Sequence, residues 1–342
     1  MTLSKKLSLK IQKVFKYEYW HYLIFYTPMF FYGAYLALKA RSIMYFSAVN
    51  SAFKYGGVMG DSKSKALEMI PEKYLPDMMV IDLEAEEWKN EISELPLKYP
   101  MIAKPDIGER GTNVEKIDDQ KGLYNYMYRM QCGKVILQEY IDLPLELGVL
   151  YYRFPDQKSG NISSVVQKSF LKVTGDNVKT VEELLAGNIR AYDKIEYFRK
   201  KYGESLKKIP ASGEELVMEP IGNHCRGTKF INGNHLINEN LIEVFDEITK
   251  NMTGYCYGRF DIKVKSLKNL YEGNGIKVLE LNGVSSEPAH IYDPDMNLIQ
   301  AYKDVAQHMK IIYEISQANH KKGISYSRSW PFIKDLYCHI RQ

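Results

Sequence analysis

The chain has 342 residues, of which 45% are hydrophobic and 26% are charged. This composition is that of a globular protein with room for two domains, and it excludes an intrinsically disordered chain. The net charge of +4 comes from 46 basic and 42 acidic residues, a balance too even to indicate a nucleic-acid partner, so we expect none. The four cysteines stand far apart without metal-ligand spacing, which favours free thiols in a reducing compartment.

The N-terminal region contains an uncharged aromatic tract from Tyr19 to Leu38, which is about as long as a membrane span. A signal peptide is disfavoured because no small-residue cleavage site follows, and a transmembrane helix because Pro28 and Gly33 interrupt the tract. Two interpretations stay open. Residues 1–45 either lie on a membrane surface or pack as helices on the protein's own core. In the first case an apolar helical stripe opposite lysines leads into an aromatic hairpin at headgroup level, and the stripe comprises Leu3, Leu7, Ile11, Val14 and Phe15.

The remaining helices and strands are predicted, in chain order, from the hydrophobic pattern and from the Gly and Pro residues that interrupt it. Residues 64–76 predict a short helix that stops at Pro71. A short strand over Pro100–Pro105 leads through a glycine-bearing loop to a second strand. The later predicted strands cover 135–141, 147–154, 162–173, 257–264 and 276–282, and the predicted helices lie near 180–202, 238–251 and 293–318. A turn rich in Asn and Gly joins the last two strands, and the whole order predicts an α+β fold with mostly antiparallel sheets.

Five polar side chains on the last two predicted strands form a candidate site. Side chains alternate along a strand, so Arg259, Asp261 and Lys263 share one face, as do Glu280 and Asn282. If the strands pair, two carboxylates and an amide oxygen offer the hard ligands that Mg²⁺ prefers, beside a guanidinium suited to a phosphoryl oxygen. A solvated sheet face with cross-strand ion pairs is the alternative.

A second candidate is the loop after the strand that ends at Lys104. Its ammonium lies beside the segment GERGTN, whose backbone N–H groups could bind an anion. The loop matches neither the P-loop nor the GxGxxG pattern, which disfavours a Walker-type NTPase and a Rossmann dehydrogenase.

In order and spacing, the segments DSKSK, IAKPDIGERG, LQEYI, GRFDIKV and VLELNG, which lie within residues 61–290, resemble the ATP-grasp superfamily. Within it, the resemblance is to carboxylate–amine ligases related to D-alanine–D-alanine ligase. It implies an α+β ATP-grasp fold in which two α+β subdomains hold ATP between antiparallel sheets. We expect an atypical aromatic-rich helical segment over 1–55, serving as a cap or membrane-surface element, an ATP-grasp domain over 56–320 with its ATP lid at about 100–140, and a tail over 321–342.

The resemblance also implies roles for individual residues. Arg259 and Lys104 are the expected catalytic groups, and Lys168 is preferred to Lys172 as a further nucleotide lysine. The other expected nucleotide-binding residues are Lys63, Gly108, Arg110, Gly111, Glu139, Tyr140, Ile141 and Glu146, with Lys104 shared between both roles. Two Mg²⁺ ions, or Mn²⁺ in their place, are expected on Asp261, Glu280 and Asn282.

The implied activity is an ATP- and Mg²⁺-dependent ligation. The γ-phosphoryl group of ATP would pass to a substrate carboxylate, and an amine would attack the resulting acyl phosphate. A small-molecule kinase and a non-catalytic, nucleotide-binding, membrane-associated module are the alternatives. We expect a protein that is cytoplasmic or peripheral on the inner face of a membrane, and the sequence leaves its oligomeric state open.

The substrate end departs from the ligases that the chain resembles. The sequence after Asn282 lacks their Pro-Gly turn, so D-alanine is not supported, and the aromatic tract stands in place of their N-terminal domain. A pocket built partly from aromatic side chains would suit an amphiphilic or lipid-linked carboxylate, and these side chains are Trp20, Phe25, Phe30 and Phe31. The candidate substrate residues are His224, Arg226, Glu287 and His290, with a purely structural imidazole as the alternative for each histidine.

Overall fold

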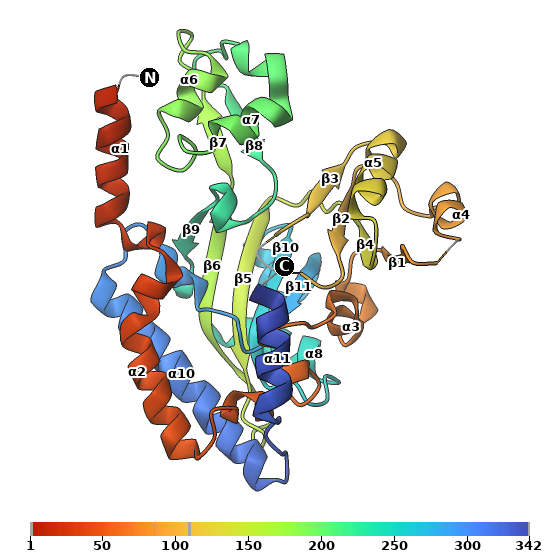
Figure 1. Cartoon of the computed structure of the whole chain (residues 1–342), viewed down its shortest axis with the longest axis vertical. Coiled ribbons are helices and arrows are strands. Elements are labelled where there is room, and N and C mark those ends of the chain that lie inside the picture. The colour runs from red at the N-terminus through yellow and green to blue at the C-terminus, as the bar shows by residue number, and fades with distance from the viewer. Residues whose placement is uncertain (1–2, 86, 109–110, 341–342) are drawn as a thin grey trace.

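A five-stranded antiparallel sheet forms the centre of the computed structural model, which describes residues 3–85, 87–108 and 111–340 (Figure 1). Its strand order is β11-β10-β5-β6-β9. The strands are β5 (Leu145–Tyr152), β6 (Asn161–Ser169), β9 (Lys229–Asn232), β10 (Tyr257–Val264) and β11 (Ile276–Asn282). Its largest apolar core packs the sheet against three helices, namely α3 (Lys63–Glu68), α8 (Glu239–Thr249) and α9 (Leu267–Tyr271).

A second sheet of four strands, in the order β1-β4-β2-β3, faces the end of the first. Its strands are β1 (Met78–Asp82), β2 (Met101–Pro105), β3 (Glu115–Ile117) and β4 (Lys134–Glu139). The helices α4 (Trp88–Ser93) and α5 (Gln120–Met130) cover it and share its separate apolar core. This unit takes in β1 and α4, so it begins well before the range of about 100–140 expected for a lid.

A third unit is the hairpin of β7 (Leu171–Thr174) and β8 (Glu215–Glu219). The helices α6 (Val181–Ala186) and α7 (Ile195–Tyr202) pack on it around their own small core. α6 begins with a capping box between Thr180 and Glu183, which satisfies backbone donors at its first turn.

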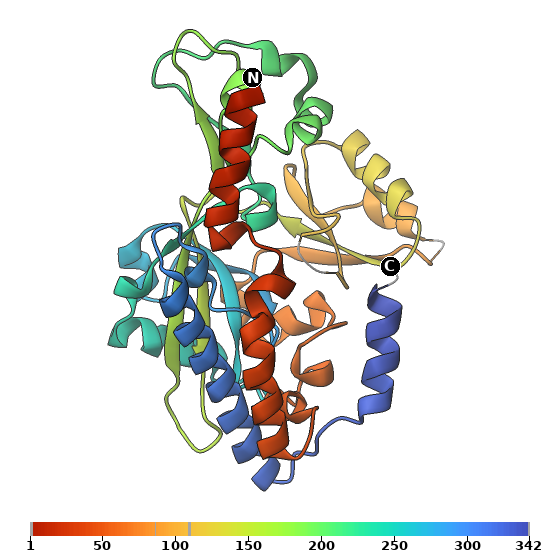
Figure 2. The same cartoon turned by 60° about the vertical axis from the view of Figure 1, so that its left-hand side comes forward.

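The N-terminal tract packs on the C-terminal part of the chain. α1 (Leu3–Phe15) and α2 (Tyr22–Ala40) run end to end along one side of the molecule, and α2 lies along α10 (Leu298–Lys321) in both views (Figures 1 and 2). α2 is one continuous helix, whereas the membrane-surface interpretation expected a hairpin, because Phe25, Leu36 and Ala40 bury a helical stripe against α10 and its neighbours. Among the residues that the structure describes, no helix combines the length and apolarity required to cross a membrane.

Most predicted elements occur within a few residues of their predicted bounds. The predicted strand over 162–173 is divided into β6 and β7, and the predicted helix near 180–202 is divided into α6 and α7. The connection between β10 and β11 holds the short helix α9 as well as a turn, because Ser266 caps the helix by accepting from Asn269 N at 3.2 Å and Leu270 is buried. The range expected as a tail contains α11 (Ser329–Ile340), a further helix.

Candidate active site

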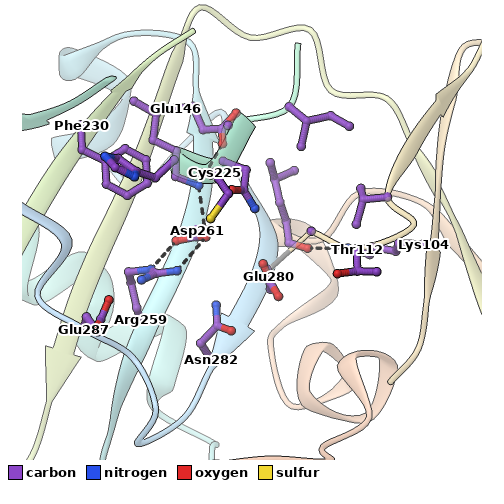
Figure 3. A pocket seen from close by; sticks show the side chains of 18 of the residues that line it. Lys104, Thr112, Glu146, Cys225, Phe230, Arg259, Asp261, Glu280, Asn282 and Glu287 are labelled. Carbon is purple, nitrogen blue, oxygen red and sulfur yellow. Dashed lines mark hydrogen bonds and ion pairs between the residues drawn. The ribbon is translucent and has the colours of Figure 1, made fainter. Parts of the chain in front are cut away.

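The five polar residues predicted on the last two strands do meet on one surface. β10 and β11 pair so that Arg259 stands opposite Asn282 and Asp261 opposite Glu280. Together with Lys263, these side chains line a cavity of about 600 Å³ between the five-stranded and four-stranded sheets. Figure 3 shows Arg259 and Asp261 turned towards each other, with Glu280 and Asn282 on the neighbouring strand. The alternating pattern therefore correctly predicted that the side chains of these two strands share one surface, which is a wall of the cavity.

Asp261 is held by two cations. Arg259 Nε donates to Asp261 Oδ1 at 2.8 Å, and Lys168 Nζ donates to Asp261 Oδ2 at 3.1 Å. Burial alone raises the pKa of the Asp261 carboxyl, but the charges of Arg259 and Lys168 outweigh burial and hold that pKa below its usual value. Asp261 is thus an anion fixed in position at neutral pH.

Lys168 also binds the neighbouring strand. Its Nζ donates to Glu146 Oε1 at 3.0 Å, so β5, β6 and β10 each supply one member of a buried ionic cluster. Burial opposes the lysine's charge, yet Asp261 and Glu146 together raise the pKa of Lys168. Alternation left open which face Lys168 would take, and the structure places it inward, whereas Lys172 is at the surface in an ion pair with Glu215.

Two glycines make room for this cluster. A Cβ at Gly148 would lie 3.2 Å from Asp261 Oδ1 and 2.8 Å from Val166 Cγ1. A Cβ at Gly222 would lie 2.1 Å from Glu146 Oε1. Neither glycine was singled out from the sequence, because both contacts join segments that are distant in the chain.

Lys104 reaches the cavity from the opposite sheet. Its Nζ donates to Gln138 Oε1 on β4 and to Leu279 O on β11, both at 3.0 Å, so one side chain connects the two sheets. Burial lowers the pKa of Lys104 to about 8, although the charge of Glu280 opposes the shift. Removing a cation from water is unfavourable, so the buried ammonium of Lys104 would gain stability from a bound anion. The ammonium would in turn hold that anion in the cavity.

Lys63 stands at the start of α3 beside the glycine-bearing loop. Its Nζ donates to Gly108 O, and Ser64 N donates to Asp106 Oδ1 at 2.8 Å. Gly108, Gly111 and Lys63 all line the cavity. Arg110, which the sequence also predicted here, lies outside the described residues.

The end of β4 and the two residues after it also line the cavity. Glu139, Tyr140 and Ile141 line it, and Lys263 Nζ donates to Ile141 O at 2.7 Å. Lys263 Nζ also lies 5.2 Å from the Tyr140 ring centroid. This side chain shares the cavity face of β10, but no role was predicted for it.

The N-terminal segment closes the other end of the cavity. Six of its residues line it, namely Tyr17, Glu18, Trp20, His21, Tyr22 and Phe25. Glu18 Oε2 accepts from Arg190 Nη2 at 2.5 Å and lies 3.5 Å from His224 Nε2, and Tyr17 donates to Ile291 O at 2.6 Å. Of the four aromatic side chains predicted for a substrate pocket, Trp20 and Phe25 line the cavity, whereas Phe30 and Phe31 are 55% and 75% exposed and do not line it.

The four predicted substrate residues divide into two pairs. His224 and Glu287 line the cavity, and Glu287 accepts from Tyr292 OH at 2.9 Å. His290 is not among the lining residues, because its imidazole is buried between Ser164 Oγ at 2.7 Å and Asp304 Oδ2 at 3.0 Å.

Arg226 is also absent from the cavity lining. It donates to Gly111 O at 2.7 Å and to Val114 O at 3.0 Å, so it connects its segment to the glycine-bearing loop. The geometry therefore supports positioning contacts for Arg226 and His290 in place of direct contact with a substrate.

The donors on β10 and β11 fit a hard divalent cation. Asp261, Glu280 and Asn282 offer two carboxylates and an amide oxygen, and Mg²⁺ takes few protein oxygens and completes its shell with water and phosphate. The side-chain nitrogens of Asn282 and Gln138, both on the cavity, are buried and lack a hydrogen-bond partner within the described part of the chain. Among the described residues, no three His, Cys, Asp or Glu side chains form a group suited to a metal. The proposed ligands on β10 and β11 include two carboxylates, and their third member is an amide.

Comparison with known proteins found similarities only among solved structures. Neither a protein-family model nor a curated protein sequence matches the chain. Among solved structures, D-alanine–D-alanine ligase from Bacillus anthracis is similar at 15% identity over 82% of this chain and 72% of its own, with a TM-score of 0.43. VanG D-Ala:D-Ser ligase from Enterococcus faecalis is similar at 13% identity over 77% and 62%, also with a TM-score of 0.43.

A bifunctional glutathione synthetase from Pasteurella multocida is similar at 16% identity over 70% of this chain, with a TM-score of 0.34. The chain spans only 36% of the length of that protein. The substrates in these names are those of the named proteins.

Proposed function

We propose that the chain is an ATP- and Mg²⁺-dependent ligase that activates a carboxylate as an acyl phosphate and joins it to an amine. The observation that carries this proposal is the pairing of Asp261 with Glu280 across β10 and β11, with Arg259 beside them. Lys104 reaches the same cavity from the four-stranded sheet. Phosphoryl transfer requires positioning and charge neutralisation more than a protein nucleophile, and this arrangement supplies both.

The nucleotide would lie between the two sheets. In this proposal Glu139, Tyr140 and Ile141 offer backbone groups to the adenine edge, and Glu146 accepts from the ribose hydroxyls. The phosphates lie towards Lys63, Lys104 and Lys168, beneath the loop that contains Gly108 and Gly111. All of these residues line the same cavity, which supports this placement.

Asp261, Glu280 and Asn282 would hold Mg²⁺, or Mn²⁺ in its place. The bound ions would neutralise the charge of the phosphates during transfer. Arg259 adds a fixed positive charge beside the transferred group, and because Asp261 and the surrounding strands hold its guanidinium, little reorganisation is needed when charge develops.

The reaction has two balanced steps. A carboxylate oxygen of the substrate attacks the γ-phosphorus of ATP, the bond from that phosphorus to the β,γ-bridging oxygen breaks, and ADP leaves. The amine then attacks the acyl carbon, phosphate departs, and the amine proton passes to the departing phosphate. Water must stay out during this interval, and Tyr17, Trp20 and Phe25 form an aromatic wall at the substrate end that would exclude it.

The same wall supports an amphiphilic or lipid-linked substrate. Its aromatic rings favour apolar groups, while Glu18, Glu287 and His224 provide polar contacts at the cavity. We accordingly propose that residues 1–55 act as a cap on a catalytic domain of residues 56–320, followed by a tail of residues 321–342.

The direct test is a product search with purified protein, ATP, Mg²⁺ and pooled carboxylates and amines. Mass spectrometry should show ADP together with a product whose mass equals acid plus amine minus water. Glu280→Ala should abolish this turnover, whereas the matched control Glu247→Ala, on the exposed face of α8, should leave it unchanged. A phosphorylated product formed without an amine would refute ligation, and undiminished turnover in Glu280→Ala would refute the metal assignment.

A further inference from the structure

The apolar stripe of α1 faces solvent, the reverse of what a helix on a protein surface normally does. Its members are Leu7, Ile11, Val14 and Phe15, which are between 49% and 81% exposed. The side that faces the protein instead holds Leu9, which is 7% exposed, and Lys13, which pairs with Asp193 at 2.7 Å. At 3.6 residues per turn, Leu9 lies roughly half a turn round the helix from the exposed stripe.

α2 also has an exposed apolar side. It buries one stripe against α10, yet its outward side is also apolar. The outward side chains are 49% to 79% exposed and comprise Leu23, Ile24, Phe30, Phe31, Tyr35 and Leu38. Helices on globular proteins normally present polar side chains outwards, and several large apolar side chains exposed along one side of a helix mark an interaction site. We call the exposed sides of α1 and α2 together the N-terminal face.

The N-terminal face is positively charged, which indicates the chemistry of its partner. Residues 1–41 contain seven Lys or Arg and a single acidic residue, Glu18. Glu18 is buried against Arg190, so it presents no carboxylate to a partner. Lys10 is exposed beside the α1 stripe, and Lys6 is exposed elsewhere on the same helix. Lys39 and Arg41 are exposed at the end of α2. A second copy of this chain would place like charges together in a two-fold interface, whereas an anionic lipid surface complements them.

We propose that the N-terminal face docks onto an anionic lipid bilayer, with its apolar side chains in the interfacial region and its basic side chains among the headgroups. The two helices lie end to end along one side of the molecule in both views, so both can meet one plane (Figures 1 and 2). The contact lies on the surface and does not cross the membrane, which agrees with the finding on helix length and apolarity.

Docking would bring the cavity close to the lipid. Tyr17, Trp20 and Phe25 line the cavity and belong to the segment that joins α1 to α2 and to the start of α2. This segment thus forms a wall of the candidate active site, and it lies between the two helices whose exposed sides make up the N-terminal face. The docking itself is independent of the proposed ligase activity, because it needs neither nucleotide nor metal.

Flotation of the full-length chain with vesicles, without nucleotide, tests the proposal. One set of vesicles contains phosphatidylcholine alone and the other contains phosphatidylcholine mixed with phosphatidylserine. The wild type should float with the mixed vesicles, weakly with the neutral ones, and less at high salt. A lysine near an anionic surface changes partitioning roughly fivefold, so Lys10→Glu should weaken binding about tenfold or more.

Matched controls lie on α5, across the molecule from α1 and α2 in Figure 1. Lys121 and Tyr128 are exposed there. Phe15→Ser and Lys10→Glu should lose flotation, whereas Tyr128→Ser and Lys121→Glu should keep it, with unchanged circular dichroism in all four. Glu280→Ala should float like the wild type, which separates this proposal from the ligase proposal.

Three results would overturn docking. The wild type could stay unbound with both kinds of vesicle, or the α5 variants could lose as much binding as the α1 variants. Light scattering could instead show a dimer that Phe15→Ser dissociates, without flotation, which would assign the N-terminal face to self-association.

Discussion

The buried ion pair between Glu18 and Arg190 offers the sharpest test of how the N-terminal segment is held at the cavity. The two side chains are 3% and 10% exposed and meet at 2.5 Å. Arg190→Met removes the cation and leaves the carboxylate buried, with His224 Nε2 at 3.5 Å as its remaining partner among the described residues. Breaking a buried pair on one side is strongly destabilising, so we expect a loss of about 3 kcal/mol in the free energy of unfolding.

The effect should depend on pH in a defined direction. Burial raises the pKa of Glu18, but the hydrogen bond with His224 and the charge of Arg190 outweigh burial and lower it below 4.5. The pair therefore stabilises the fold at pH values above the unfolded pKa, and this contribution is lost as the pH falls through the folded pKa. In Arg190→Met, the charge of Arg190 no longer offsets the effect of burial on the pKa of Glu18. The difference in stability between this variant and the wild type should therefore be largest near neutral pH and shrink in acid.

Urea denaturation followed by circular dichroism measures these changes, and a double-mutant cycle isolates the pair. Glu18→Gln together with Arg190→Met should recover much of the stability lost in Arg190→Met alone, because no unpaired charge stays buried. A loss below about 0.5 kcal/mol in Arg190→Met, or strict additivity in the cycle, would refute the reasoning, since exposed pairs contribute amounts of that size.

Three other predictions concern the cavity. Lys104→Met should weaken ATP binding about tenfold or more, as measured by isothermal calorimetry. The affinity of the wild type for ATP should fall as the pH rises through the pKa of Lys104, about 8, because the ammonium loses its charge. An affinity for ATP that does not change with pH would contradict this prediction. Gly148→Ala should lower the free energy of unfolding by about 1–3 kcal/mol in urea denaturation, because its Cβ would meet Val166 Cγ1 at 2.8 Å; unchanged stability would contradict this. Chelation with EDTA should abolish ATP turnover and added Mg²⁺ or Mn²⁺ should restore it in a coupled ADP assay, so turnover that persists in EDTA would count against the metal.

Local pattern was sufficient to predict the central strands of the candidate site. Alternation along 257–264 and 276–282 predicted that Asp261 and Glu280 could share one surface if the two strands paired. The observed register makes these two residues direct partners. Such predictions succeed because the period of a strand and a short connection together restrict where side chains point.

Contacts between distant segments could not be predicted in the same way. Tyr17 donates to Ile291 O across 274 residues, and nothing local to either residue indicates this contact. Phe30 and Phe31 belong to the same aromatic tract as Phe25, but their faces of α2 became clear only once its packing on α10 was known. His290 likewise follows the predicted metal residues closely, yet its partners Ser164 and Asp304 come from other elements.

The most direct test of the proposed ligation follows the oxygen of the substrate carboxylate. Once the product search has identified the acid and the amine, the acid is labelled with ¹⁸O and the released inorganic phosphate is analysed by mass spectrometry. An acyl phosphate intermediate leaves one carboxylate oxygen on the phosphate, so the phosphate should carry ¹⁸O, and Glu280→Ala should release none. Phosphate without ¹⁸O alongside amide product would contradict activation of the carboxylate by phosphoryl transfer.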